Sequence, residues 1–537
     1  MAKYEIKDGV GIIPEGTTCI EYRAFKEGKE LLSVVIPKSV TSIEYRAFED
    51  CKELLSVVIP KSVTSIGVAA FSGCSALKNI EFTDNSQLTE IKNEAFFKCS
   101  SLSDITIPNC VKKIGAAAFH NSPWEERQPD GLIYINKILY KYKGEMVENT
   151  NIVINKGTTA ISSQAFSWKW HLNSISIPNS VTEIGEYAFN NCKGLTKINI
   201  PDNITKIEDG TFNDCPNLTE ITIPDSVTEI GRSAFHRCYN LIEISIPDSV
   251  TEIGEYAFCG CKIVSATLPI NLKKIDIGVF CGCPNLESVE LPPNIEYLGG
   301  RYDSSLDRNG AFGGCSKLKN ILLNEGLQVI GLRSFKDCKN IESIKIPTTV
   351  TYIGNESFLN CSSLKSIFIP EGVEEIGFSA FGGCTSLQKI VLPRSLNNLK
   401  KSAFKGCTAI KEIIVPIENE AYLKKQLPQE LHPFVKVTSE TLADTTPEPV
   451  IEAIPAQDTA PAKEIVKEPA PASVETSIEK PSSAPVKKEA VASAPAKKEA
   501  AKTTNKPAEK SAGKSTAKPS EGEPKSIFGR ILSLFKK

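Results

Sequence analysis

The chain has 537 residues, with 62 Lys and Arg against 64 Asp and Glu, which leaves a formal net charge of −2. Its length suits several ordinary domains or one long repetitive domain. No segment approaches the roughly 18 consecutive apolar residues of a membrane-spanning helix, so a transmembrane protein is not predicted. The first residues, MAKYEIKDGVGIIPEGTT, lack a basic stretch followed by an apolar one. Together with seventeen cysteines, an odd number, this start predicts a cytoplasmic protein with free thiols.

A repeat of about 23 residues begins near the N-terminus and fills the first four-fifths of the chain. Three copies read IPNSVTEIGEYAFNNC, IPDSVTEIGRSAFHRC and IPDSVTEIGEYAFCGC, starting at Ile177, Ile223 and Ile246. One Phe recurs in each copy, at positions 25, 48, 71, 96, 119, 166, 189, 212, 235, 258, 280, 312, 335, 358, 381 and 404. This period, with Leu and Ile at fixed offsets, is typical of a leucine-rich solenoid.

The consensus L-x-x-I-x-I-P-x-S-V-T-x-I-G-x-x-A-F-x-x-C predicts one coil of such a solenoid. The I-x-I stretch favours a short strand that ends at the Pro, and V-T-x-I favours a second short extended piece. The Gly permits a tight turn, and A-F-x-x-C has the spacing of a single helical or 3₁₀ turn. We therefore expect an α/β-type solenoid dominated by short parallel strands, a leucine-rich repeat superhelix over residues 1–415, followed by a disordered tail.

The repeat consensus I-P-x-S-V-T-x-I-G-x-x-A-F-x-x-C resembles the BspA-type leucine-rich repeat, a family named after a bacterial surface antigen. The resemblance covers about residues 4–437. SPWEERQPDGLIYINKILYKYKG resembles the hairpin-bearing insert of bacterial members, at about 123–150, and VPIENEAYLKKQL resembles their closing cap, at 416–437. The resemblance implies a protein-binding role, which in some members is adhesion to host matrix proteins.

Thirteen cysteines lie three residues after a repeat Phe, which predicts a column of small buried side chains, because zinc requires four converging ligands. Cys259 and Cys281 instead directly follow the Phe, in a slot that we expect to face solvent. They lie one coil apart and are a candidate redox pair, the alternative being exposed, inert thiols.

Catalytic signatures are not found in the sequence. None of the four histidines has a metal-ligand spacing such as H-E-x-x-H, and neither G-x-x-x-x-G-K-[ST] nor G-x-S-x-G occurs. Most acidic residues fall at repeat positions that face solvent. We therefore predict a non-enzymatic protein with no metal and no cofactor.

The residue between the two inward Ile of each strand is expected to point out of the concave face. In the middle coils this residue is small and polar, whereas the C-terminal third presents an apolar stripe. The predicted partner-binding stripe is Leu322, Lys345, Phe368, Val391 and Ile414. Two alternatives remain: the cap folds over the stripe, or strands merely favour such residues.

A nine-residue insertion, GRYDSSLDR at 300–308, lengthens one coil beside this stripe. Its Arg301, Tyr302, Asp307 and Arg308 form a candidate recognition loop. Neutral tolerance of an insertion at a solenoid edge is the alternative, because loop lengthening costs little.

The repeat pattern stops near residue 438, and residues 438–524 are rich in Ala, Pro and Lys, which predicts a disordered tether. Residues 525–537, KSIFGRILSLFKK, predict an amphipathic helix. On a helical wheel one face gathers the apolar side chains of Ile527, Phe528, Ile531, Leu532, Leu534 and Phe535, and the cationic Arg530, Lys536 and Lys537 lie on the other. The predicted role is docking to an anionic membrane surface; a partner's groove and the chain's own apolar stripe are the alternatives.

Taken together, these patterns predict a monomeric, non-enzymatic scaffold that binds a protein or peptide through its concave face and is tethered to the inner face of a membrane. Nucleic-acid binding is not expected, because the Lys-rich runs contain interleaved Glu and no aromatic residues. The alternative function is a secreted or surface-exposed adhesin that binds host or matrix proteins.

Overall fold

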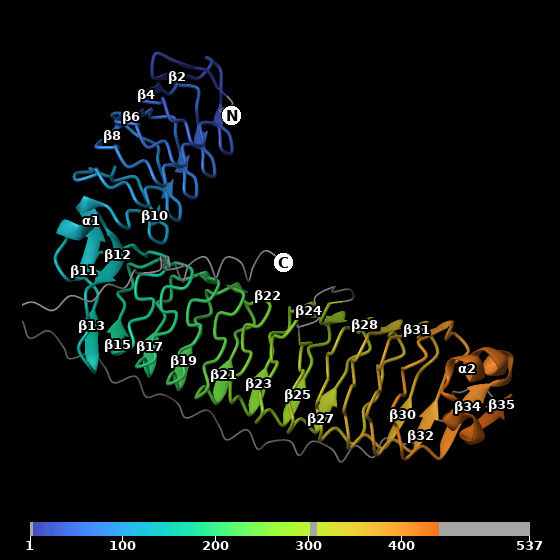
Figure 1. Cartoon of the computed structure of the whole chain (residues 1–537). Coiled ribbons are helices and arrows are strands. Elements are labelled where there is room, and N and C mark those ends of the chain that lie inside the picture. The colour runs from blue at the N-terminus through green and yellow to red at the C-terminus, as the bar shows by residue number, and fades with distance from the viewer. Residues whose placement is uncertain (1–3, 301–308, 440–537) are drawn as a thin grey trace, which may run out of the picture. The chain divides into compact units, whose positions relative to one another are not determined.

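The computed structural model describes residues 4–300 and 309–439, all within the compact unit Met1–Ala453. Successive coils stack side by side, and their strands form two rows, one of longer and one of shorter strands (Figure 1). The predicted fold class is confirmed, because the coils pair through parallel strands and contain little helix.

The row of longer strands comes mostly from the I-x-I part of the repeats, and its last strand belongs to the C-terminal cap. It contains β2 (Val10–Ile12), β4 (Ser33–Val35), β6 (Ser56–Ile59), β8 (Asn79–Phe82), β13 (Thr150–Val153), β15 (Leu172–Ser176), β17 (Lys197–Asn199), β19 (Glu220–Thr222), β21 (Glu243–Ser245), β23 (Ser265–Thr267), β25 (Ser288–Glu290), β27 (Asn320–Leu322), β30 (Ser366–Phe368), β32 (Lys389–Val391), β34 (Glu412–Pro416) and β35 (Val435–Thr438). The antiparallel β1 (Ile6–Lys7) covers the free edge of β2 at the N-terminal end.

The row of shorter strands comes from the T-x-I-G part. It contains β3 (Cys19–Ile20), β5 (Ser42–Ile43), β7 (Ser65–Ile66), β9 (Glu90–Ile91), β10 (Lys113–Ile114), β14 (Ala160–Ile161), β16 (Glu183–Ile184), β18 (Lys206–Ile207), β20 (Glu229–Ile230), β22 (Glu252–Ile253), β24 (Lys274–Ile275), β26 (Tyr297–Leu298), β28 (Val329–Ile330), β29 (Tyr352–Ile353), β31 (Glu375–Ile376) and β33 (Asn398–Leu399). Equivalent residues pair, as Ile207 does with Ile230, so like side chains lie above one another.

The repeat Phe forms the central column of the core. Phe235 and Phe258 are fully buried and stack with ring centroids 5.3 Å apart and an interplanar angle of 2°. The same stacking joins Phe25 to Phe119 through three intermediate coils and continues from Phe166 to Phe404. Each ring therefore stabilises two neighbours, and no single coil closes its own core.

The consensus Cys and Ser complete backbone hydrogen bonding between coils. The thiol of Cys215 donates to the carbonyl of Phe189 at 3.1 Å, and the other column cysteines make the equivalent bond. The hydroxyl of Ser249 likewise donates to the carbonyl of Val227 at 2.7 Å. All thirteen column thiols are buried and free, as expected for a column of small buried side chains.

The consensus Gly has a different role from the one predicted. Gly254 needs no left-handed backbone, but a Cβ there would lie 2.5 Å from the amide nitrogen of Arg232 in the preceding coil. Glycine is therefore required because two backbones approach closely. The A-F-x-x-C segment also differs from the prediction: it forms consecutive turns in place of a helical turn, with Ser233 and Arg237 in the left-handed region on either side of Phe235.

A helix and a hairpin interrupt the solenoid after the fifth repeat Phe, Phe119 (Figure 1). They are α1 (Pro123–Arg127), β11 (Gly131–Ile135) and β12 (Ile138–Lys143). Because side chains alternate across a strand, Ile138 and Tyr140 belong to the N-terminal hydrophobic core, whereas Leu139 belongs to the C-terminal one. The hairpin thus lies between two hydrophobic cores and contributes side chains to both.

A buried carboxylate connects α1 to the hairpin. Glu125 accepts hydrogen bonds from Lys141 at 2.8 Å and Tyr140 at 3.2 Å, and lies 3.0 Å from the Nδ1 atom of His120. Burial raises the pKa of Glu125, but hydrogen bonds and positive charge from His120 and Lys141 outweigh it and lower that pKa to about 2.

The C-terminal end is closed by η1 (Ile417–Asn419), α2 (Glu420–Gln426), η2 (Gln429–Phe434) and β35, which pairs with β34. Leu423, Leu427 and Leu431 bury their side chains in the C-terminal core. Among the helices of the described part of the chain, none has the length and apolarity needed to cross a bilayer.

We predict that Phe235→Ala destabilises the solenoid by about 3–5 kcal/mol, because it removes one ring from a close-packed column and leaves a cavity. Phe378→Ala is the matched control, since the side chain of Phe378 is 55% exposed, and it should change stability by no more than about 0.5 kcal/mol. Urea unfolding followed by circular dichroism measures both. Equal effects would show that the Phe column is not the dominant packing element.

Candidate functional site

We call the outward-pointing side chains of the longer strands the long-strand face. On its N-terminal coils, Ile12 pairs in register with Val35, and Val58 pairs with Glu81 on the next strand. The side chains of Val35 and Val58 are 70% and 45% exposed, and Ile12 is exposed too. Five aliphatic side chains in three adjacent coils therefore meet solvent, and we call them the N-terminal apolar patch: Ile12, Leu32, Val35, Leu55 and Val58.

Small serine residues lie between the apolar residues of the patch. Ser33 and Ser56 pair in register between Leu32 and Leu55 on one side and Val35 and Val58 on the other. In the next coil the equivalent positions are polar, namely Lys78, Asn79 and Glu81. The apolar surface therefore ends at β8, where the outward side chains become polar.

The predicted C-terminal stripe is only partly exposed. Leu322 and Lys345 are exposed, and the Nζ atom of Lys345 lies 3.3 Å from a carboxylate oxygen of Glu325. Phe368 and Ile414 are half-buried, and Val391 is 1% exposed, so the assignment of Val391 to an exposed stripe is wrong. The register places Val391 between the larger side chains of Phe368 and Ile414, which accounts for its burial.

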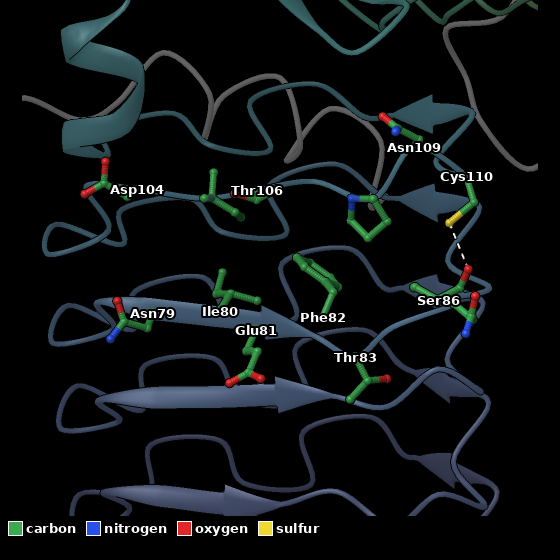
Figure 2. Close-up of a pocket in the computed structure, with 13 residues that line it drawn as sticks. Asn79, Ile80, Glu81, Phe82, Thr83, Ser86, Asp104, Thr106, Asn109 and Cys110 are labelled. Carbon is green, nitrogen blue, oxygen red and sulfur yellow. Dashed lines mark hydrogen bonds between the residues drawn. The ribbon is translucent and has the colours of Figure 1, made fainter.

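A cleft of about 740 Å³ lies beside the apolar patch, between β8 and residues 104–110 (Figure 2). The sheet that contains β8 ends there, and β13 begins another sheet. Of the backbone hydrogen bonds in the described residues, none joins β8 to residues 104–107, although the repeat places a strand at that position. β8 therefore has an open edge.

An irregular coil accounts for the cleft. Phe71 and Phe96 are 25 residues apart, and the sequence TDNSQ at 83–87 replaces the usual start P-x-S of the turn. Phe82 and Ile105 occupy core positions of their repeats, yet both are half-buried, whereas the equivalent Ile59 and Val57 are buried. The longer turn thus lies beside the cleft, where two apolar side chains are partly exposed.

The cleft is acidic at one end and closed at the other. Asp104 and Asn79 lie at one end, near Glu81, and the thiol of Cys110 donates to the carbonyl of Ser86 at 3.1 Å at the other (Figure 2). The residues that line it include Glu81 and Asp104 but no Lys or Arg. Asp104 accepts a hydrogen bond from Ser103, and an Arg127 nitrogen lies 3.9 Å away in a solvent-exposed pair.

The candidate redox cysteines are joined in the structure. The Sγ atoms of Cys259 and Cys281 form a disulfide between adjacent coils, with Cα atoms 4.6 Å apart, within the range for disulfides. Cys259 is half-buried and Cys281 is buried, so the expectation that both face solvent is wrong for Cys281. Redox activity of the pair stays a prediction.

Two other predicted sites lie outside the described residues. They are the candidate recognition loop, with Arg301, Tyr302, Asp307 and Arg308, and the amphipathic segment 525–537. The tether at 440–524 lies outside them too.

Comparison with known proteins decides the family. The model of the BspA type leucine rich repeat region matches residues 11–125, 135–235, 206–302 and 308–425. The chain belongs to the BspA-type leucine-rich repeat family. No curated protein matches it.

Several solved bacterial leucine-rich repeat proteins are similar to this BspA-type chain. A leucine-rich repeat protein from Bacteroides ovatus is 26% identical, with 76% of this chain and 91% of that chain covered and a TM-score of 0.46. A leucine rich cell surface protein from Faecalibacterium prausnitzii is also 26% identical, covering 71% and 87%, with a TM-score of 0.28. Both TM-scores lie below 0.5, so the assignment rests on the repeat model.

We predict that the cysteine column makes this BspA-type solenoid sensitive to alkali. Burial raises the pKa of Cys99, Cys215 and Cys283 to about 12. Because the folded pKa exceeds the unfolded value of about 8.5, the stabilisation is complete below that pH and is lost as the pH rises towards 12. Urea midpoints at pH 7, 9 and 10.5 measure the loss.

Cys215→Ala separates the thiol from other groups that titrate in alkali. This variant is less stable at pH 7 because the substitution leaves a cavity. Its free energy of unfolding should nevertheless fall less steeply with pH than that of the wild type, and the two slopes should differ by up to about 1.4 kcal/mol per pH unit. Identical pH slopes for the two proteins would refute the assignment.

Proposed function

We propose that this BspA-type protein is a non-enzymatic protein-binding scaffold whose partner docks on the N-terminal apolar patch of the long-strand face. The observation that supports this is the exposure of five aliphatic side chains on three adjacent coils, among which Ile12 and Val35 pair in register. Contiguous apolar surface on a soluble domain marks interaction sites. The predicted stripe in the C-terminal third is less suitable, because Val391 is buried and Phe368 and Ile414 are half-buried.

The size of the patch suits the centre of an interface. Burying an exposed aliphatic side chain contributes roughly 1–2 kcal/mol, so a few such contacts supply most of the affinity of an ordinary complex. The polar side chains that follow, Lys78, Asn79 and Glu81, would lie at the rim of that interface.

Adhesion at a bacterial surface is the version of this role that the family resemblance implies. It is favoured over the cytoplasmic location predicted from the sequence. The partner would then be a host or matrix protein.

We predict that Val35→Asp and Val58→Asp each weaken partner binding at least about tenfold, because each buries an unpaired charge at the interface. Val153→Asp is the matched control, since Val153 occupies the same outward slot on β13 and is 74% exposed. The full chain is passed over a panel of purified extracellular matrix proteins, and the affinity of each variant is measured by surface plasmon resonance.

A photo-reactive amino acid at position 35 tests the scaffold without assuming the partner. In living cells it should cross-link one discrete protein, the cross-link should disappear with Val58→Asp, and position 153 should give none. No binding to matrix proteins would exclude the adhesin version. Equal cross-linking from positions 35 and 153 would refute the patch.

We further propose that residues 525–537 attach the scaffold to an anionic membrane surface, as their sequence pattern suggests. The full chain should sediment with vesicles that contain phosphatidylglycerol and stay in solution with pure phosphatidylcholine. Phe528→Glu with Leu532→Glu should abolish sedimentation, whereas Ser526→Glu with Ser533→Glu, which adds the same charge on the polar face, should reduce it less. Equal sedimentation of the two double variants would contradict a helix that buries its apolar face.

A further inference from the structure

We propose that the cleft between β8 and residues 104–110 binds a short extended peptide segment with alternating basic and apolar side chains, which adds a strand to the open edge of β8. This inference deepens the proposed function, because it names the chemistry of one partner segment. It concerns a site next to the N-terminal apolar patch, and its test does not require the patch to bind anything.

Backbone pairing is the first argument. β8 pairs with β6 along its whole length, from Asn79 opposite Ser56 to Phe82 opposite Ile59, but has no ladder partner on its other side among the described residues. An open strand edge offers unpaired N–H and C=O groups to another extended chain. The four residues of β8 span ~13 Å, enough to pair with a segment of about four residues.

The available space supports the same ligand. Many other strand junctions of the solenoid, such as β4 with β6, are closed by ladder hydrogen bonds between equivalent residues, although β19 and β21 are not paired in a ladder either. At β8 a cleft of about 740 Å³ takes the place of that ladder, and this volume lies within the range of ordinary ligand pockets.

Apolar side chains of the ligand have two partners in the cleft. Phe82 of β8 and Ile105 of the segment 104–110 both line it, and both are half-buried although their positions are core positions in other coils. Covering them removes apolar surface from water. Pro108 also lines the cleft.

The charge of the cleft selects basic side chains. Glu81 and Asp104 are both exposed and line the cleft, whereas no cationic residue does. Arg127 lies 3.9 Å from Asp104, but both side chains are more than 60% exposed, so a ligand cation can replace it at little cost. Alternation places basic and apolar side chains of an extended ligand on opposite faces.

The experiment measures binding of a fluorescein-labelled peptide, acetyl-Lys-Val-Lys-Val-Lys-amide, to the full chain by fluorescence anisotropy. We expect saturable binding that weakens with added salt. The combined Glu81→Gln and Asp104→Asn variant should lose at least about tenfold in affinity. Glu290→Gln, which removes an exposed carboxylate from the equivalent slot of β25, should bind like the wild type. Circular dichroism confirms that the variants fold.

Two further peptides separate backbone pairing from charge attraction. A peptide with N-methyl groups on alternate amides keeps its charge but cannot pair along one edge, and it should bind at least about tenfold more weakly. A peptide with Glu in place of Lys should not bind. Hydrogen exchange should show slower exchange of the amides at 79–82 when the first peptide is bound.

Any of three results would overturn the proposal. The peptide shows no saturable binding up to about 1 mM, the double variant binds it with unchanged affinity, or the N-methylated peptide binds equally well. If Val35→Asp abolishes peptide binding while the Glu81 and Asp104 double variant still binds, the peptide occupies the apolar patch and the cleft proposal fails. Failure in the cleft with intact cross-linking at position 35 would leave the scaffold function standing.

Discussion

Stacking of identical side chains from one coil to the next is the interaction on which this solenoid depends. Phe212, Phe235 and Phe258 lie one above another in the core, and each column thiol donates to the carbonyl of the Phe in the preceding coil. A coil isolated from its neighbours would expose its ring and leave that carbonyl unpaired. Stability is therefore shared between neighbours, as in other repeat architectures.

Because the coils depend on their neighbours, an irregular coil also changes the packing of the coils beside it. The longer turn at 83–87 borders the cleft after β8, where Phe82 and Ile105 are half-buried. The hairpin after α1 divides the hydrophobic core, because Ile138 and Leu139 face opposite sides. Between irregular coils the core positions repeat, and one coil differs from the next mainly in its outward side chains, as Val58 does from Glu81.

Much of the fold could be predicted because each repeat position meets nearly the same surroundings in every coil. The inward Ile, the Phe column and the buried Cys follow from period and spacing alone. The role of glycine could not be predicted in the same way: at Gly254 the constraint is the backbone of the preceding coil at Arg232, and such approach between coils is not visible in one repeat. Around Phe235 the amides of Ser233 and Phe235 donate to carbonyls of the next coil, and consecutive turns replace the predicted helical turn.

The candidate site was harder to predict, because exposure depends on neighbours across the sheet. Val391 and Val35 occupy the same slot of the repeat, yet one is buried between Phe368 and Ile414 and the other is open to solvent between Ile12 and Val58. The cleft had a visible signal, the 25-residue spacing after Phe71 together with the missing Pro at Thr83.

The position of the cleft next to the apolar patch links the two proposed contacts. Val58 in the patch pairs in register with Glu81 in the cleft, so the apolar and acidic surfaces lie on adjacent strands. An apolar surface alone discriminates poorly between partners, because burial is non-directional. An adjacent open strand edge with two carboxylates adds direction and charge. A partner that offers both an apolar surface and a basic extended segment would therefore be selected over one that offers only the first.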